Sequence, residues 1–529
     1  MNRRKQLAFI TGVVVLLLEF TLLLGEVLGY PDASVSGIVL GPDGPIPGAH
    51  VRIRATDNLT YSGIDGSFTL NGLIEGEPSE ITAWSDGYYI ASAKITPTVT
   101  GVILTLRPYH TADNPSYEWA DPTSCDACHP MITPQWTGNA HGQAISNPRF
   151  FSLYNGTDIT GTELISPGFK LDYPEIAGNC AVCHAPGAAA NDPFATEMNT
   201  IRDQPTAGIH CDFCHKVGGI YFNPDDGIPY DNAAGVLSLH LLRPPAGEDI
   251  FFGPYDDIKD PDTYLPEMQQ SIYCAPCHQF SFWGTPIYQS FVEWQESPYP
   301  AMGIECQTCH QPPNGDNLFA LPEAGGLWHP AESIPSHNDL GIKDTEFMTS
   351  TVTMSVTART LIDRLDVTVT LMNAGAGHHV PTDHPGRHLI LTISAVDESG
   401  QPLPQTSGGI IPEWGGLQAG MTGKAFAKVL KDAATGAYPV VSYWKQCFIL
   451  SDNRIPALQS DTSTYHFSVH PGGGEITISV DLLFRRNFQS EMDARGWTSP
   501  DILMQSELIK LPEETVFRIF LPLVETIQN

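Results

Sequence analysis

Five copies of one short motif constrain this chain more than any other feature. Each copy has two cysteines separated by two residues and followed directly by a histidine (C-x-x-C-H). A shuffled chain with the same 11 Cys and 18 His among 529 residues would contain about 0.008 such motifs, so the repeat is not accidental. The copies, in chain order, are unit 1 (Cys125, Cys128, His129), unit 2 (Cys180, Cys183, His184), unit 3 (Cys211, Cys214, His215), unit 4 (Cys274, Cys277, His278) and unit 5 (Cys306, Cys309, His310).

The spacing matches the chemistry of covalent haem attachment. Two cysteines separated by two residues can each form a thioether with one haem vinyl group, and the next histidine then binds the iron. The sequence therefore predicts five haem c groups, attached through the ten cysteines of the units and bound on one side by the five unit histidines. The eleventh cysteine, Cys447, lies in the run Tyr443–Phe448 and is expected to be a buried structural thiol.

Three alternative roles for paired cysteines fit this pattern less well. Zinc ribbons pair two C-x-x-C units for each metal and do not require a histidine after each one, and an odd number of units fits that pairing poorly. A thioredoxin-like pair would occur once, within a βαβ pattern that this sequence does not show. Ordinary disulfides leave the histidine after every unit unexplained.

A second histidine could bind each iron from the other side, because ten further histidines lie between residues 110 and 388. His329 is the rival of His337 as such a distal ligand, His379 is the rival of His378, and Met131 can replace one histidine. His240 lies in an apolar run, where a buried core histidine is a serious alternative. The predicted distal ligands are His141, His210, His240, His337 and His378. With all five positions filled, every haem would be low-spin and suited to electron transfer.

The spacing of the units also predicts what fills the interior. From Cys125 to His310 the chain has 186 residues, or roughly 37 for each haem, too few for five separate protein cores. We therefore expect the porphyrins themselves to form most of the apolar interior of residues 112–345, packed against one another and surrounded by short helices and loops.

The flanking segments predict export and two β domains. Residues 1–29 contain Arg3, Arg4 and Lys5 before a mostly apolar stretch, which is typical of an export signal that is cleaved or kept as an N-terminal anchor. Residues 31–108 and 346–529 show short alternating strands separated by turns, which predicts a β-sandwich at each end. In the C-terminal segment the strand candidates include residues 365–371, 389–393, 476–480 and 516–520. The expected fold class is thus multidomain, with a haem-packed domain of low regular structure between the sandwiches.

Two segments resemble known families. Within residues 119–345, the stretches Gln135–Gly142, Gly208–His215, Cys274–His278 and Gly303–His310 resemble the multihaem cytochrome family related to cytochrome c554. The resemblance implies closely packed haems with two histidines at most irons, some donated from distant segments, and it supports His141 best. This chain has five units where cytochrome c554 has four, so the one open haem of that protein cannot be assigned here.

The N-terminal segment carries the second resemblance. Gly44–Ala49 and Asp65–Phe68 are similar to carboxypeptidase-regulatory-like, transthyretin-type sandwiches. Modules of that kind are usually structural or adhesive, and no catalytic set accompanies this one. The resemblance therefore implies no chemistry for residues 31–108.

These observations lead to three functional hypotheses. The first is a pentahaem cytochrome that passes electrons outside the cytoplasm, in the periplasm, at the cell surface or beyond it, to redox partner proteins or extracellular acceptors, rather than a catalyst. The second is a multihaem oxidoreductase acting on a small nitrogen or sulfur compound at one open haem, and the third is a homopolymeric, conductive filament. The net charge of −32 excludes a nucleic-acid partner, because nothing would neutralise phosphates. Only the N-terminal segment would contact a membrane.

Overall fold

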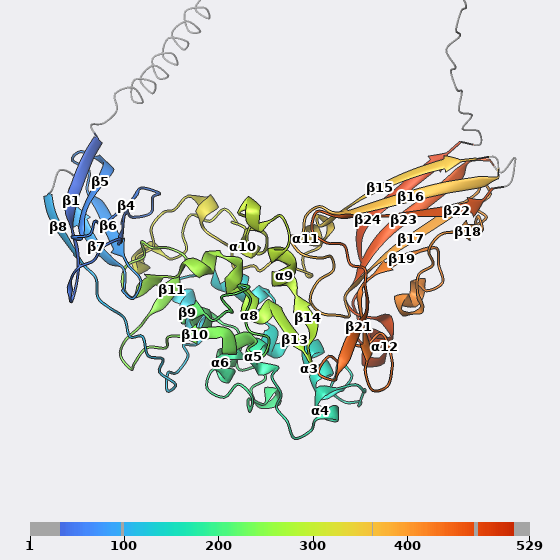
Figure 1. Cartoon of the computed structure of the whole chain (residues 1–529), viewed down its shortest axis with the longest axis horizontal. Helices are drawn as coiled ribbons and strands as arrows, with labels where there is room; N and C mark the ends of the chain where they lie inside the picture. The colour runs from blue at the N-terminus through green and yellow to red at the C-terminus, as the bar shows by residue number, and fades with distance from the viewer. Residues whose placement is uncertain (1–31, 97–99, 362, 470–473, 513–529) are drawn as a thin grey trace, which may run out of the picture.

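The computed structural model describes residues 32–96, 100–361, 363–469 and 474–512. Along an arc, a β-rich N-terminal region, a central region of short helices and loops, and a large β-rich C-terminal region follow one another (Figure 1). The predicted export signal and the predicted strand at residues 516–520 lie outside the described residues. Among the residues that are described, no helix combines the length and the hydropathy that crossing a bilayer requires.

The N-terminal region consists of two four-stranded sheets. One has the order β2-β1-β5 with β8 parallel to β1, and the other has the order β4-β3-β6-β7. Apolar residues of both sheets share one core, as expected for alternating strands. The strands are β1 (Asp32–Gly41), β2 (Gly44–Pro45), β3 (His50–Ile53), β4 (Leu59–Tyr61), β5 (Ser67–Ile74), β6 (Ser79–Trp84), β7 (Ala91–Ile95) and β8 (Thr100–Thr105).

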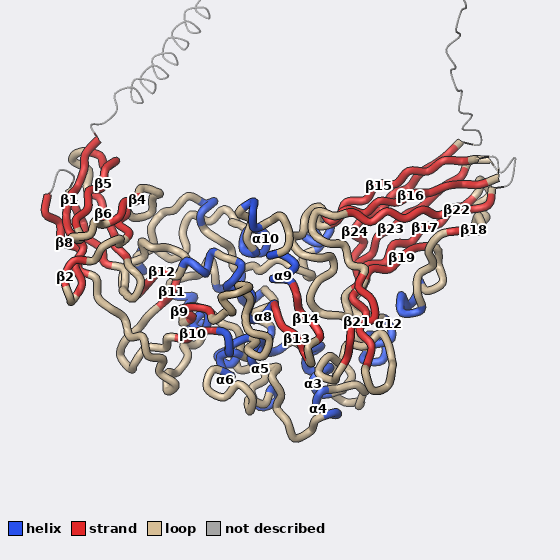
Figure 2. The backbone as a smooth tube through the Cα atoms, in the orientation of Figure 1, coloured by secondary structure: helices blue, strands red, loops and turns tan. Residues whose placement is uncertain are grey.

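The central region contains only short elements, which loops connect (Figure 2). Its α-helices are α2 (Thr133–Gly138), α3 (Pro148–Asn155), α4 (Phe169–Asp172), α5 (Ala181–His184), α6 (Pro186–Ala189), α7 (Cys211–Cys214), α8 (Ala275–His278), α9 (Ser290–Gln295), α10 (Cys306–His310) and α11 (Thr345–Thr349). Its strands form three pairs: β9 (Val217–Ile220) with β10 (Leu239–Leu241), β11 (Phe251–Gly253) with β12 (Asp262–Tyr264), and β13 (Gln279–Phe282) with β14 (Thr285–Gln289).

The C-terminal region is a sandwich of two four-stranded sheets with the orders β15-β16-β22-β18 and β19-β17-β23-β24. A further hairpin, β20 with β21, and helix α12 lie toward the central region (Figure 1). The elements are β15 (Val352–Thr360), β16 (Arg364–Asn373), β17 (His388–Val396), β18 (Gln405–Ser407), β19 (Gly423–Phe426), β20 (Lys428–Asp432), β21 (Cys447–Asp452), β22 (Ser460–Ser468), β23 (Ile476–Arg485), α12 (Gln489–Arg495) and β24 (Ile502–Leu511).

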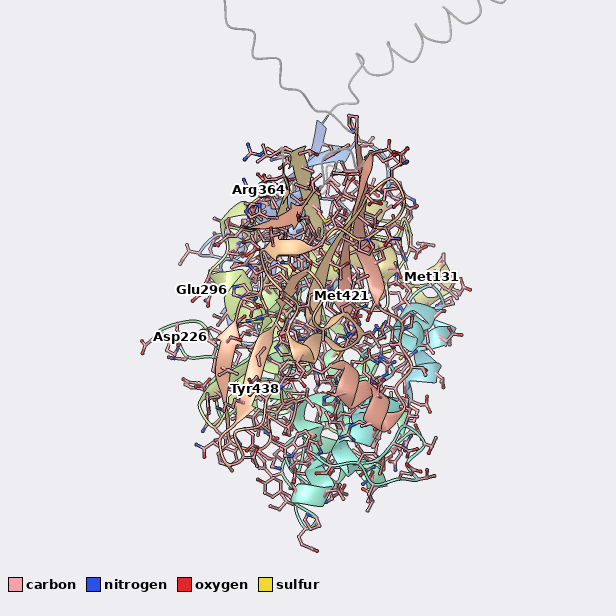
Figure 3. All side chains as sticks on the ribbon, turned by 90° about the vertical axis from the view of Figure 1, so that its right-hand side faces the viewer. Met131, Asp226, Glu296, Arg364, Met421 and Tyr438 are labelled. Carbon is pink, nitrogen blue, oxygen red and sulfur yellow. The ribbon has the colours of Figure 1, made fainter. Side chains whose placement is uncertain are left out.

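Alternation along the strands explains this sandwich and confirms the predicted fold class. Leu365, Val367, Val369 and Leu371 of β16 are all buried. Strand β23 alternates between buried and half-buried positions along most of its length. The inward-facing residues of both sheets meet in one continuous core. Figure 3 shows the sandwich end-on, with Arg364 and Met421 on its surface.

Specific contacts attach both β regions to the central one. On the N-terminal side, the Trp84 indole donates to the Thr263 hydroxyl over 3.0 Å. On the C-terminal side, Lys428 Nζ donates to the carbonyl of Ile287 over 2.6 Å. The loop of residues 374–387 between β16 and β17, which we call the strap, reaches from the sandwich into the central region.

Candidate haem-binding site

Each C-x-x-C-H unit lies on a single helical turn. Units 2 to 5 coincide with α5, α7, α8 and α10, and unit 1 begins on the 3-10 helix η1 (Pro122–Ala127). A turn of this kind brings side chains three and four positions apart to one face. It therefore presents both cysteines and the histidine of a unit to the same group. The His129 amide donates to the Cys125 carbonyl over 2.8 Å, which shows that the turn of unit 1 extends to its histidine.

Cysteines of different units lie against one another. Each of three pairs of thiols lies close enough for one member to shift the pKa of the other: Cys125 with Cys211, Cys183 with Cys277, and Cys274 with Cys306. These contacts pair unit 1 with unit 3, unit 2 with unit 4, and unit 4 with unit 5. All eleven cysteines are described, and none forms a disulfide. Cys447 is 3% exposed, which confirms the prediction that it is a buried thiol.

The proximal histidines are oriented through their Nδ1 atoms. His129 donates to the carbonyl of Phe319 over 2.8 Å, His215 to that of Phe252 over 2.6 Å, and His310 to that of Leu340 over 2.6 Å. His278 donates to the Asp383 carboxylate over 3.2 Å. Such bonds fix the ring and its tautomer and leave Nε2 free to bind a metal, as is usual for metal-binding histidines.

The unit 4 histidine faces His141. The ring centres of His141 and His278 are 6.4 Å apart. Two imidazoles on opposite sides of one metal, with metal–nitrogen bonds of about 2 Å, have their ring centres about 6 Å apart. His141 also donates from Nδ1, to the Asp339 carboxylate over 2.8 Å. The two side chains keep 40% and 43% of their surface accessible, so they leave room for a flat group between them.

The unit 5 histidine faces the strap in the same manner. The rings of His310 and His378 are 6.2 Å apart and nearly parallel, with an angle of 16° between their planes. His378 Nδ1 donates to the carbonyl of His379 over 2.9 Å. His379 itself interacts with Glu293. The geometry therefore favours His378 over its rival as a partner of unit 5.

His337 lies in the neighbourhood of units 1 and 3. Burial lowers its pKa, and the charge of His129 lowers it further, while Asp339 opposes both effects. His337 also contributes to the lowered pKa of His215, for which burial is the main cause. The His337 Nδ1 atom is buried and has no hydrogen-bond partner among the described residues. Its rival His329 instead packs against Tyr255 and Phe319.

Among the described residues, no ring contact joins His210 to a unit histidine; its ring neighbours are Trp119 and Phe213. His210 is buried, and its Nδ1 accepts the backbone N–H of Phe213 over 3.2 Å, which caps α7. A neutral ring that accepts at Nδ1 carries its proton on Nε2. The His210 Nε2 atom is buried and has no hydrogen-bond partner among the described residues.

His240 lies beside Tyr221, with ring centres 5.6 Å apart, at the edge of a cavity of about 240 Å³ that Asp113 also lines. Among the described residues, no ring contact joins His240 to a unit histidine. Met131 lies at the periphery of the central region (Figure 3). The roles of His210, His240 and Met131 as ligands stay predictions.

Sequence reasoning missed residues that only the fold brings together. Burial and Arg387 are the main causes that lower the pKa of His384, in the strap, to about 3. His184 of unit 2 lowers it further, which indicates that the two histidines are close. Phe150 stacks on His184 with ring centres 4.3 Å apart. The carboxylates of Asp339 and Asp383 lie 198 and 105 positions from the histidines they bond. The one local signal was the high density of histidines in the strap.

The residues fit haem c better than they fit zinc. Among the described residues, no three His, Cys, Asp or Glu side chains converge as a metal site. The arrangement instead has thiols on one face of a helical turn, a histidine oriented through Nδ1, and a second ring at the separation of two ligands of one iron. The unit cysteines and histidines, with His141 and His378, would hold haem c, whose iron exchanges single electrons.

Comparisons with known proteins agree with this chemistry. Residues 124–216 match the family model described as cytochrome c554 and c-prime. Among solved structures, a penta-haem cytochrome c552 from Thermochromatium tepidum aligns with a TM-score of 0.53 and 20% identity, over 74% of this chain and 99% of that one. A family 123 glycoside hydrolase from Clostridium perfringens aligns with a TM-score of only 0.13 at 8% identity, over 30% of this chain and 26% of that one, and carries no argument. No curated protein matches the chain.

These matches test the resemblances unequally. No match supports the carboxypeptidase-regulatory-like resemblance of the N-terminal region, which stays a prediction. The central region matches the cytochrome c554 and c-prime family over units 1 to 3. The chain thus has the fold of a penta-haem cytochrome, and its comparisons support a multihaem electron-transfer cytochrome carrying haem c.

Proposed function

We propose that this protein is an exported pentahaem cytochrome that passes single electrons along a chain of haems, most of which have two histidine ligands. The observation that carries the proposal is the pairing of His141 with His278 and of His378 with His310, at 6.4 and 6.2 Å between ring centres. An iron held on both sides by histidine exchanges electrons and has no open position for a substrate.

We infer an order of the haems from the thiol contacts. Unit 1 contacts unit 3, and unit 4 contacts both unit 2 and unit 5. Burial and Asp339 raise the pKa of Cys214 of unit 3 to about 12, and Cys277 of unit 4 raises it further. This effect of Cys277 indicates that units 3 and 4 lie near each other. The proposed path therefore runs 1–3–4–5, with unit 2 as a branch from unit 4.

The protein supplies attachment and orientation along this path. The cysteines fix each porphyrin covalently, and Nδ1 bonds hold the rings of four unit histidines, all but His184, at one angle. The strap joins the sandwich to unit 5 through His378. A hydrogen bond holds another part of the strap, because Glu293 of α9 accepts from the Thr382 hydroxyl. Glu293 is itself paired with Arg454 over 2.6 Å.

We infer the class of redox partner from the net charge of the chain. With a net charge of −32, the surface would favour cationic redox proteins or mineral acceptors outside the cytoplasm. Catalysis of a nitrogen or sulfur compound would require one open iron. His337 interacts electrostatically with both His129 and His215 and can bind only one of their irons, so the other iron needs a different distal ligand in order to be low-spin.

The spin state of the ferric protein tests the proposal. We expect five haems that are low-spin, and we expect His141→Ala and His378→Ala each to convert one haem to high-spin. His466→Ala is the matched control, since His466 is bonded to Asp366 in the sandwich over 2.7 Å. Unchanged spin states in both the His141 and the His378 variants would refute the assigned ligands. Nitrite or carbon monoxide binding to the unmodified protein would favour the catalytic alternative.

A further inference from the structure

The ligands of units 4 and 5 differ in what their Nδ1 atoms bond. Around unit 5, His310 donates to the Leu340 carbonyl and His378 to the His379 carbonyl. Around unit 4, His278 donates to the Asp383 carboxylate and His141 to the Asp339 carboxylate. One facing ring pair therefore has two neutral acceptors, and the other has two anionic acceptors.

Both carboxylates are held in place and largely shielded from water. The Asp383 side chain is 9% exposed and also accepts the Ser290 hydroxyl. The Asp339 side chain is 15% exposed and accepts from the amides of Asn139 and Gln311. Arg387 acts electrostatically on Asp383, and it offsets part of that charge. The partners of Asp339 besides His141 are neutral amides, so its negative charge acts on the ring with little compensation.

A carboxylate at Nδ1 changes the iron on the other side of the ring. It draws the Nδ1 proton toward itself, which makes the imidazole a stronger electron donor. A stronger donor and a nearby negative charge both stabilise ferric over ferrous iron, because the ferric centre carries one more positive charge. Two such bonds on one haem act in the same direction.

We propose that Asp339 and Asp383 are positioning residues that give the haem of unit 4 a lower reduction potential than the haem of unit 5. This inference rests on the proposed electron-transfer function. With this order of potentials, electron transfer from the haem of unit 4 to the haem of unit 5 would be downhill. Unit 4 lies where the branch to unit 2 leaves the proposed path. The reduction potential of its haem would therefore control electron transfer from units 1 and 3 to unit 2 and to unit 5.

The ring angles allow the two haems to be identified separately. The planes of His141 and His278 are 68° apart, whereas those of His310 and His378 are 16° apart. Nearly perpendicular ligand planes leave two iron d orbitals close in energy, and nearly parallel planes separate them. The two ferric haems should therefore give distinct electron paramagnetic resonance signals, with the wider spread of g values at unit 4.

The test is a potentiometric titration of the complete haem-loaded protein, followed by that resonance. In the unmodified protein, the unit 4 signal should disappear at a lower potential than the unit 5 signal. Asp339→Asn and Asp383→Asn should each raise the ferrous-to-ferric ratio of unit 4 about tenfold at a fixed potential, or about 59 mV for one electron. Asp383→Glu should restore most of the shift, and Asp366→Asn should leave both signals unchanged.

The outcomes separate the inference from the proposed function. Five low-spin haems in which unit 4 is reduced before unit 5 would overturn the inference and leave the function intact. Shifts at two different haems in the two Asn variants would overturn the placement of both carboxylates on unit 4. A high-spin or haem-free protein would overturn the function itself. If an Asn variant does not mature, the titration of the unmodified protein still decides.

Discussion

The central region and the C-terminal sandwich of this chain have different interiors. The sandwich has one core of 23 buried apolar residues contributed by both sheets. The largest apolar cluster of the central region has 15 buried members, of which four are alanines, and it lies around units 2 and 3. One chain therefore builds one region on its own side chains and the other, in our account, on groups attached to it.

The strap shows that the central region depends on residues of the sandwich. It belongs by sequence to the sandwich, between β16 and β17, yet it places His378 and Asp383 beside unit histidines of the central region. A region with little apolar core gains its order from covalent groups and from rigid neighbours. Under the proposed function, the sandwich is part of the electron path because its strap supplies His378.

The largest expected effect comes from withholding haem. In a host without cytochrome maturation, we expect the amides of residues 112–345 to exchange hydrogen freely while β16, β17, β22 and β23 keep their protection, because of these two regions the sandwich has the larger core of its own side chains. Hydrogen exchange with mass spectrometry measures both regions in one sample. Equal protection of the two regions without haem would break the comparison.

A truncation in the sandwich core should come next. Leu482 is fully buried in β23, and Leu482→Ala should lower the free energy of unfolding of the sandwich by about 2–5 kcal/mol without loss of haem. Denaturation followed by far-ultraviolet circular dichroism, with haem absorbance recorded in parallel, measures the two regions separately. Ser479→Ala on the same strand is the control, with an expected change within about 0.5 kcal/mol.

Acid should weaken the sandwich through one buried histidine. Burial, together with Arg485 and against the bond to the Gly386 carbonyl, lowers the pKa of His388 from 6.5 to about 4. Below pH 6.5 the unfolded chain binds the proton before the folded one, so stability falls between about pH 6.5 and 4, by about 3 kcal/mol. Exchange rates of β17 amides against pH measure this loss. If His388→Phe shows the same pH dependence as the unmodified chain, the assignment is wrong.

A smaller effect is expected from a helix cap in the central region. The Asn147 side chain accepts the backbone N–H groups of Arg149 and Phe150 at the start of α3, and Phe150 stacks on His184. Asn147→Ala should lower the free energy of unfolding by about 1 kcal/mol, which denaturant titration measures. It should leave the haem content unchanged, since thioethers hold the porphyrin of unit 2. Loss of haem from this variant would show that the cap, and not the attachment, orders the region.

The sequence allowed the fold class to be predicted because two local signals were strong. Alternation at Leu365, Val367, Val369 and Leu371 predicts β16, and the repeated motif predicts the attachment turns. The pairing of units could not be predicted, since Cys125 and Cys211 meet only after the chain has folded. The same holds for Asp339, whose importance rests on a bond to a ring 198 positions earlier. For His210, the place next to Cys211 suggested a ligand, and the sequence could not predict that its Nδ1 also caps α7.

The mass of the mature chain tests the central claim most directly. If attached porphyrins replace an apolar interior in the central region, the exported protein should carry five covalent haems, one on each pair of unit cysteines, with Cys447 unmodified. Intact-mass and peptide mass spectrometry count and locate them. A mature chain with free or disulfide-bonded unit cysteines, still folded across residues 112–345, would contradict the account.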